Sequence, residues 1–456
     1  MGAGDGVHRA GAGHLRGGGL NGMFLMRRAK IEDVATLLKL AKMVHFINLP
    51  ADRDIIADKA LWSEQCFEKA ASGGPAHSAR GAVGSSEASG SHAERGGTQG
   101  PGSHAVRGGT RDRGAGPVYS GEQTGLGAAV SRSDLFMFAL EDTESGGILG
   151  TSQIIAHMGG PGRPNVSLRL TKKEMFSQTL QLGASHVVAK LHLDETGPTE
   201  IGGLILQPSY RGHKAKLGRF LSLVRFHFIG LHRAFFAERV IAELMGPVTP
   251  DGRNTLWEYL GRRFINLTYA EADSFCQYSK EFITALFPHE EIYLTLLSPE
   301  ARSVIATVGP ETLPARGMLE KLGFAYKDLI DCFDGGPTLE ALTGEISLVR
   351  DTRRLPVGPA CSAADATRTA IVSVLDPDGE FRAVQTKCVL DSTTVRLTQE
   401  SLDALQVQPG GAARVGVTML DESASTSSAT NVAGVKANGA HTPSPAAKPS
   451  PTPRGG

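Results

Sequence analysis

The chain has no excess of charge of either sign, no close cysteine pair and no long apolar run. Its 456 residues carry 47 Lys and Arg against 47 Asp and Glu, so composition does not predict a nucleic-acid-binding surface. The five cysteines are an odd number without a Cys-x-x-Cys pair, which argues against a disulfide framework or zinc site and predicts a reducing compartment. No run approaches the roughly 18 apolar residues of a membrane helix. We therefore expect a cytoplasmic protein that binds neither nucleic acid nor membrane.

Three segments contain too few branched apolar residues to build a core. Residues 1–22 are rich in glycine, residues 72–131 in Gly, Ser, Ala, Arg and His, and residues 421–456 in Ser, Thr, Ala and Pro. Such segments bury too little surface to offset their ordering entropy, so we expect all three to be disordered. The first lacks an amphipathic stripe, which argues against an organelle-targeting peptide. The second is most simply an expanded loop, although its arginines could contact an anionic partner.

The rest of the chain shows helix and strand patterns, and a hydrophobic content of 41% is enough for a large core. A helix is predicted over residues 55–71 and a strand over 135–140, on either side of the second segment. Met318, Leu319 and Leu322 have helical spacing, and Gly323 suits a left-handed helix end before a strand over 324–330.

A smaller unit is predicted between residues 371 and 417. Alternating apolar residues on both sides of the turn at 376–380 predict a β-hairpin, and two more strands and a short helix at 399–405 follow. This pattern predicts a small β-rich subdomain with a structural role.

Two motifs carry a resemblance to a known family. Residues 310–324 resemble the closing helix and strand of the GNAT superfamily of acyl-CoA N-acyltransferases, and the run Phe333-Asp334-Gly335-Gly336-Pro337 resembles the arginine N-succinyltransferase family in particular. Ordered agreement extends from about residue 23 to 340 once the insertion is removed. The matching segments are residues 28–34, 48–51, 138–142, 197–201, 222–226, 240–244, 251–252, 264, 272–273 and 304–308.

The resemblance implies an α/β (α+β) fold with a mixed central sheet flanked by helices. It places a GNAT-like domain at 23–350, interrupted by 72–131, and a β-rich subdomain at 351–420. It implies transfer of a succinyl group from succinyl-CoA, or another acyl group from its CoA thioester, to the α-amine of L-arginine without a metal. Family members act in arginine catabolism, and assembly into a homo- or hetero-oligomer is left open.

The same resemblance suggests where the acyl-CoA binds. Residues 200–206 match the strand that pairs with pantetheine, and their two glycines predict a bulge or a close backbone approach by a ligand. Leu204 matches a family position that contacts succinyl-CoA, and backbone N–H groups near Leu204, Ile205 and Leu206 would stabilise the oxyanion of a tetrahedral intermediate. The alternative is an ordinary core strand with a glycine kink.

The loop after this strand leads into a helix that is predicted to extend to about residue 233. Its N-terminal N–H groups, with Arg211, Lys214 and Lys216, would suit a pyrophosphate and a 3′-phosphate. The superfamily favours Arg/Gln-x-x-Gly-x-Gly/Ala here, whereas this loop is two residues longer, Lys216 takes the place of the first glycine and only Gly218 clearly matches. The alternative is a solvated basic helix start.

The acceptor pocket should offer carboxylates to the cationic groups of arginine. Glu243, Asp331 and Asp334 match family positions and are the candidates, with Glu243 also the candidate proton acceptor. Each could instead be structural, since Asp before Gly-Gly often caps a turn.

Two departures from the family bear on activity. The proposed proton-transfer histidine of the family is replaced by Gly309, which cannot transfer a proton, and the bulky residues 43–50 replace a glycine-rich loop. The chain has other histidines, none of them at the matching position: His192, His213, His227, His232 and His289. Attack by an already neutral amine remains feasible, because general acid–base catalysis contributes only about 10²–10⁴-fold. An N-acyltransferase with a different acyl group or amine, or a non-catalytic sensor of acyl-CoA or amino acid, are the alternatives.

Overall fold

The computed structural model describes residues 23–43, 49–73, 132–276, 279–411 and 413–420. The three segments predicted to be disordered lie outside these residues, apart from Ser72 and Gly73, which form the turn after the helix that ends at Ala71. The helices are α1 (Val34–Met43), α2 (Arg53–Ala71), α3 (Leu217–Leu231), α4 (Arg262–Phe264), α5 (Tyr269–Cys276), α6 (Glu281–Leu286), α7 (Pro299–Ser303), α8 (Leu313–Lys321), α9 (Ser347–Asp351) and α10 (Gln399–Leu405). None of the helices in this part of the chain has both the length and the apolar character needed to cross a membrane.

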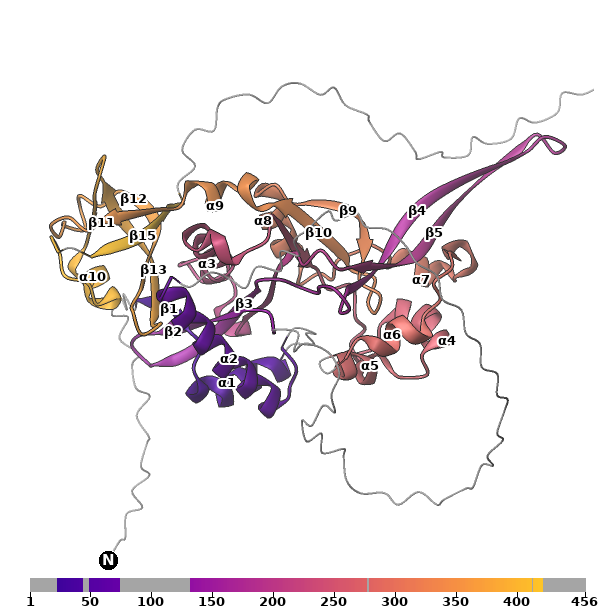
Figure 1. The fold of residues 1–456 in the computed structure, drawn as a ribbon, viewed down its shortest axis with the longest axis horizontal. Coiled ribbons are helices and arrows are strands. Elements are labelled where there is room, and N and C mark those ends of the chain that lie inside the picture. Colours follow the sequence, from indigo (N-terminus) through magenta and orange to yellow (C-terminus); the bar gives the residue numbers. More distant parts are fainter. Residues whose placement is uncertain (1–22, 44–48, 74–131, 277–278, 412, 421–456) are drawn as a thin grey trace, which may run out of the picture. The chain divides into compact units, whose positions relative to one another are not determined.

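The described strands form one mixed sheet (Figure 1). They are β1 (Phe24–Arg28), β2 (Leu135–Asp142), β3 (Gly147–Ile155), β4 (Asn165–Ser177), β5 (Leu182–Asp194), β6 (Thr199–Leu206), β7 (Arg239–Glu243), β8 (Ile292–Tyr293), β9 (Ala325–Ile330), β10 (Pro337–Leu342), β11 (Arg353–Pro356), β12 (Arg368–Leu375), β13 (Phe381–Leu390), β14 (Val395–Leu397) and β15 (Arg414–Met419). The strand order is β11-β15-β12-β13-β1-β2-β3-β6-β7-β10-β9-β4-β5-β8, and β14 pairs with β13. The fold class predicted from the sequence is confirmed.

Alternation along β2 builds a core on each face of the sheet. Phe136 and Phe138 are buried with α3, whereas Met137 and Ala139 are buried with α1. The two helices lie on opposite sides of β2 and β3 (Figure 1). The helix α2 contributes to both cores because it lies along the edge of β2 beyond the end of β1. There the Ser63 hydroxyl accepts a hydrogen bond of 2.8 Å from the Met137 N–H.

The predicted local structure around Gly323 is confirmed: α8 precedes it, β9 follows it, and its φ angle is +96°. The hairpin predicted around 376–380 is formed by β12 and β13. Because β13 also pairs with β1, the strands of residues 351–420 continue the main sheet, and a domain boundary at 350 stays a prediction.

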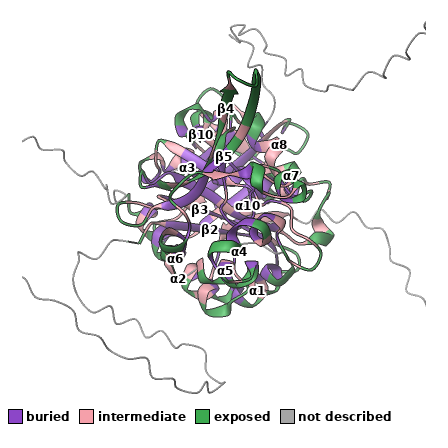
Figure 2. Ribbon diagram, turned by 90° about the vertical axis from the view of Figure 1, so that its right-hand side faces the viewer, coloured by how far each residue is buried: buried purple, intermediate pink, exposed green. Residues whose placement is uncertain are grey.

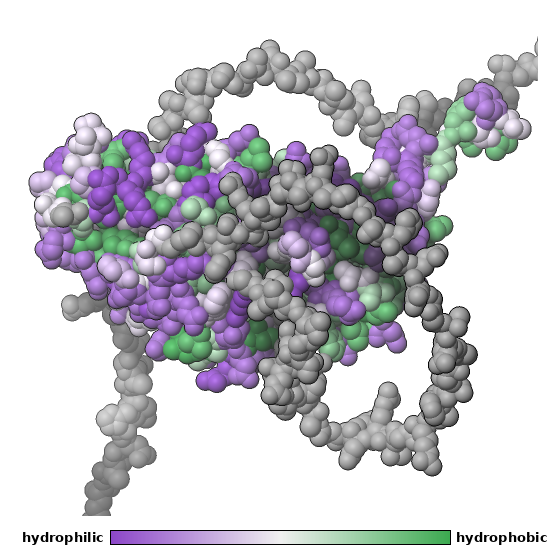
Figure 3. All heavy atoms as spheres, viewed as in Figure 1, coloured by the Kyte–Doolittle hydropathy of each residue, from purple (hydrophilic) through white to green (hydrophobic). Residues whose placement is uncertain are grey.

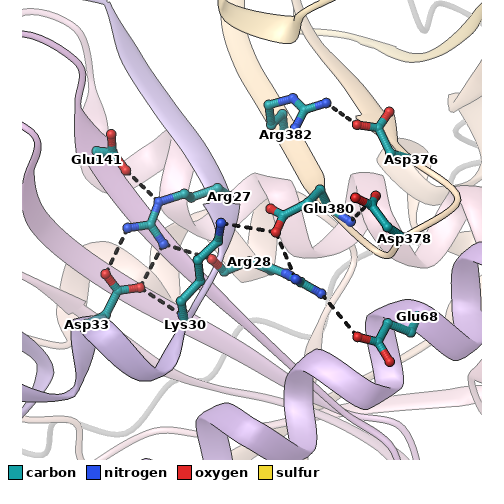
Figure 4. A network of polar contacts seen from close by, with 10 residues as sticks. All are labelled: Arg27, Arg28, Lys30, Asp33, Glu68, Glu141, Asp376, Asp378, Glu380 and Arg382. Atoms are coloured by element: carbon teal, nitrogen blue, oxygen red, sulfur yellow. Dashed lines mark hydrogen bonds and ion pairs between the residues drawn. The ribbon is translucent and has the colours of Figure 1, made fainter.

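A polar network joins this C-terminal hairpin to the start of the fold (Figure 4). Glu380, in the β12–β13 turn, pairs with Arg28 at 2.8 Å and with Lys30 at 3.0 Å. The neighbouring Arg27 guanidinium donates two hydrogen bonds to Asp33, at 2.7 and 2.8 Å. These charged contacts fix β1 between the N-terminal helices and the hairpin.

A third core lies under β4, β5 and β9, where helices α4 to α6 cover the sheet. Trp257 stacks on Phe333 with ring centroids 4.9 Å apart, and both side chains are buried. The β4–β5 hairpin extends beyond this core, and its outer part is exposed (Figure 2). Phe176 and Leu180 near its end are among the exposed apolar side chains. The outer part of the hairpin carries both hydrophobic and hydrophilic residues on its surface (Figure 3).

Candidate active site

The predicted cofactor strand, β6, contains a bulge at its glycines. Thr151 of β3 faces Ile205 and Gln153 faces Gly202, so β6 has one residue more than β3 between the two pairs. Gly203 takes the extra position with a φ of +56°, which favours glycine. A Cβ atom at Gly203 would lie 2.9 Å from Cγ of Gln153, so any larger residue at this position would also clash with Gln153. The predicted bulge is confirmed.

Pairing between β6 and β7 ends early. The two parallel strands share only the pairs Thr199 with Val240 and Glu200 with Ile241. Beyond these pairs a pocket lies between the strands and is closed by side chains of α3 and α8. Its lining residues are Ile201, Gly202, Gly203, Leu204, Arg225, Ala242, Glu243, Leu244, Met245, Glu311, Thr312, Ala315, Leu319, Asp331 and Asp334. Parting strands leave backbone N–H and C=O groups facing the pocket, where an extended ligand can use them.

The bulge decides which predicted cofactor residues reach this pocket. Leu204 lines it, whereas the Ile205 side chain is buried with α1 on the opposite face, so only its backbone can contact a ligand bound there. Leu206 packs against the α3 core, and its Cδ2 atom would be 3.7 Å from a Cβ atom at Gly218.

The three predicted basic residues before α3 do not converge on one point. Arg211 pairs with Glu311 of the pocket at 3.2 Å, but Lys214 lines a second pocket with Tyr210, Phe220 and others. Lys216, which replaces the first glycine of the superfamily motif, has the left-handed backbone that glycine favours, with φ of 56°. This observation supports the alignment of Lys216 with that glycine.

The predicted acceptor residues lie together at one wall of the pocket. The Glu243 carboxylate accepts a 3.0 Å hydrogen bond from the Asn165 amide, and Lys280 donates to the same amide group at 3.3 Å. One oxygen of Asp331 accepts from the backbone N–H groups of Phe333 and Asp334, at 2.7 and 2.9 Å. The second oxygen of Glu243 and that of Asp331 accept no hydrogen bond from another described residue.

Asp334 differs from its two neighbours. Its oxygens accept from the backbone N–H groups of Gly336 at 2.7 Å and Gly246 at 3.0 Å, and the side chain is buried. Asp334 therefore holds the Gly-Gly turn against the end of β7, which favours the structural alternative for this residue.

Glu200 of β6, which the sequence did not single out, does not line the pocket but interacts electrostatically with Glu243 and Asp331. It is 1% exposed, and neither carboxylate oxygen has a hydrogen-bond partner among the described residues. Burial, and next the Glu243 carboxylate, raise the pKa of Glu200 to about 8. The sequence signal that could have identified Glu200 is a charged residue within a strand whose other residues are mostly apolar or glycine. No sequence pattern identified Lys280, because only the tertiary fold brings it close to these carboxylates.

The raised pKa predicts how stability depends on pH. An unfolded Glu loses its proton near pH 4.3, but folded Glu200 keeps its proton to about pH 8, so folded-state stability falls as pH rises between these values. Lys59, Glu243, Lys280 and Asp331 are the charged groups that act on it. We expect Glu200→Gln to reduce this loss. The free energy of unfolding in urea, taken as variant minus wild type, should therefore increase from pH 5 to pH 8. A constant difference across this range would contradict the assignment.

The glycine in place of the family histidine lies beside this wall. The Gly309 N–H donates to the Met245 carbonyl at 3.0 Å, and a Cβ atom at Gly309 would be 3.3 Å from the Gly246 oxygen. None of the five alternative histidines lines the pocket. His227, for example, lies in the core between Thr418 and Ser373, and burial lowers its pKa to about 3. Residues 44–48 of the altered N-terminal loop lie outside the described residues, so its effect on the pocket stays a prediction.

The fold is that of an acyltransferase. It matches the solved structure of the arginine/ornithine succinyltransferase subunit AI from Pseudomonas aeruginosa with a TM-score of 0.65 and 24% sequence identity. The match covers 88% of this chain and 99% of that chain.

Sequence comparison identifies the family. The family model described as "Arginine N-succinyltransferase beta subunit" matches residues 121–348. The arginine N-succinyltransferase of Yersinia enterocolitica is 37% identical over 281 residues, which cover 61% of this chain and 81% of that protein. The Photorhabdus laumondii protein of the same name is 36% identical over the same shares. The chain belongs to the arginine N-succinyltransferase family.

Proposed function

We propose that this protein transfers the succinyl group of succinyl-CoA to the α-amine of L-arginine and releases N2-succinylarginine and CoA. The observation that carries the proposal is the pocket between β6 and β7, which joins a bulged strand edge to a wall of carboxylates. Family membership supports arginine as the acceptor, and the carboxylates of Glu243 and Asp331 suit its cationic groups.

In this proposal pantetheine runs along the strand edge at Leu204, between α3 and α8. The start of α3, with Arg211 and Lys216, would hold the phosphates through N–H groups and positive charge. Gly218, which has no side chain, leaves space for the phosphates at that first helical turn. Lys214 would contribute only by long-range attraction, because it lines the second pocket.

The reaction requires a neutral α-amine at the thioester carbonyl. Attack forms a C–N bond and a tetrahedral intermediate, whose oxyanion would be stabilised by backbone N–H groups of residues 204–206. Collapse of the intermediate breaks the C–S bond, and the amine proton passes to the Glu243 carboxylate or to water while CoA leaves as the thiolate. No step requires the histidine that Gly309 replaces.

The mass of the product tests this proposal. The full chain is incubated with L-arginine and either succinyl-CoA or acetyl-CoA, and then with a panel of other amines. We expect succinylarginine from the first mixture at an enzymatic rate, which would also show that an imidazole at position 309 is dispensable. If only acetylarginine forms, or if only another amine is acylated, the proposed acyl donor or acceptor is wrong, but the assignment as an N-acyltransferase stands.

A non-catalytic sensor is the second candidate, and Gly309 is the observation that favours it. Binding of both CoA thioesters without consumption of either, with every amine tested, would support a sensor and remove the catalytic assignment. Assembly into a homo- or hetero-oligomer stays a prediction, as does a cytoplasmic location.

A further inference from the structure

The pocket contains a buried positive charge opposite its carboxylate wall. Arg225 lies in α3, lines the pocket and is only 3% exposed. Its guanidinium donates to the Ser222 carbonyl at 3.1 Å, to the Ser222 hydroxyl at 2.9 Å and to the Gly202 carbonyl at 3.4 Å. No carboxylate of the described residues forms a salt bridge with Arg225.

A buried guanidinium without a counter-ion is costly, because burial removes the water that solvates the charge. Burial accordingly lowers the pKa of Arg225 to about 9, and the group still carries its charge at neutral pH. An anion bound within the pocket would offset this cost. The pocket thus has a cation on its α3 side, while Glu243 and Asp331 lie at its other wall.

The position of Arg225 fits the acyl end of the donor. It follows Leu217, the first residue of α3, by eight residues, which corresponds to about 12 Å along a helix. The phosphates are placed at the helix start, and the hydrogen bond to the Gly202 carbonyl puts the guanidinium beside the bulge where the thioester is placed. An anion at Arg225 would therefore belong to the acyl group and not to the phosphates.

We propose that Arg225 is a specificity-determining residue that binds the terminal carboxylate of a dicarboxylic acyl group, and so selects succinyl-CoA over uncharged acyl-CoA donors. This inference rests on the proposed function, which supplies the location of the thioester. The pocket then holds the anionic acyl chain against α3 and the cationic amino acid against Glu243 and Asp331, so each substrate meets the opposite charge.

The test compares succinyl-CoA with butyryl-CoA, in which a methyl group replaces the terminal carboxylate. Hydrogen bonds to a charged group contribute about 1.5–3 kcal/mol, or about 10- to 150-fold. For Arg225→Gln we expect kcat/KM with succinyl-CoA to fall about 10- to 150-fold and that with butyryl-CoA to change less than about threefold. Arg225→Lys should restore part of the preference, because it keeps the charge but loses the planar fork.

Arg219→Gln is the matched control for donor preference: Arg219 lies in the first turn of the same helix, is exposed and does not line the pocket, so any loss should be equal for the two donors. Equal losses with both donors in Arg225→Gln, or an unchanged donor preference, would overturn the inference, as would a wild type that prefers butyryl-CoA. Thermal unfolding of each variant shows whether a loss comes from misfolding.

The inference and the proposed function fail differently. If the wild type transfers neither group, the proposed function fails, and calorimetric binding of the two CoA thioesters to wild type and Arg225→Gln still decides the role of Arg225. Tighter binding of succinyl-CoA that is lost in the variant supports the inference, and equal binding overturns it.

Discussion

We expect the Glu243→Gln variant to lose about 10²- to 10⁴-fold in kcat for arginine succinylation, which is the usual contribution of a general base. Glu243 lines the pocket and engages one oxygen with the Asn165 amide, which leaves the other oxygen for the substrate amine. Glutamine keeps the shape of this side chain but can neither accept the amine proton nor pair with a cation. Steady-state kinetics with saturating succinyl-CoA measure the loss.

The control for this prediction is Glu340→Gln. Glu340 lies on the neighbouring strand β10, pairs with Arg239 at 3.0 Å and is not among the residues that line the pocket. We expect its kcat to remain within about threefold of the wild type, because its charge lies outside the acceptor wall. A Glu243→Gln variant with normal kcat and only weaker arginine binding would remove Glu243 as proton acceptor and leave it a binding role.

The Gly336→Ala variant should not reach the native fold. A Cβ atom at Gly336 would lie 1.9 Å from the Leu244 carbonyl oxygen and 2.7 Å from the Gly246 backbone nitrogen. Both clashes are with backbone at the end of β7, where the chain cannot move without breaking the Asp334 turn. We expect a loss of more than about 4 kcal/mol, at the extreme of single substitutions, seen as insoluble protein or as a collapse of the melting temperature.

Gly344→Ala provides the comparison, since nothing lies within 4 Å of the added Cβ atom in the turn after β10. Its melting temperature should stay close to that of the wild type. Soluble Gly336→Ala protein with a wild-type melting temperature would show that the turn can move, and would contradict the role given to Asp334.

Local sequence patterns determined most of the secondary structure near the site. Gly323 marked the end of α8 because glycine adopts a positive φ without strain. The paired glycines of β6 predicted a bulge for the same reason. The order of motifs along the chain was enough to name the family, because membership depends on residues in sequence and not on distances.

The sequence could not decide which side chains meet. One extra residue in β6 turns Leu204 into the pocket and Ile205 into the core, and the bulge position sets this choice. Asp331 and Asp334 lie three residues apart in the same motif. Only the folded structure shows that both oxygens of Asp334 accept hydrogen bonds from backbone N–H groups.

The sequence by itself determined the fold class, the end of α8 at Gly323 and the family, because these depend on local conformational preference and on residue order. Only the tertiary structure decided that β6 and β7 part after Glu200, that Lys214 faces a different pocket, and that Arg225 is a buried cation opposite the carboxylates. The physical reason is that burial and the electric field at a side chain come from residues distant in sequence, which are brought together by strand pairing and helix packing.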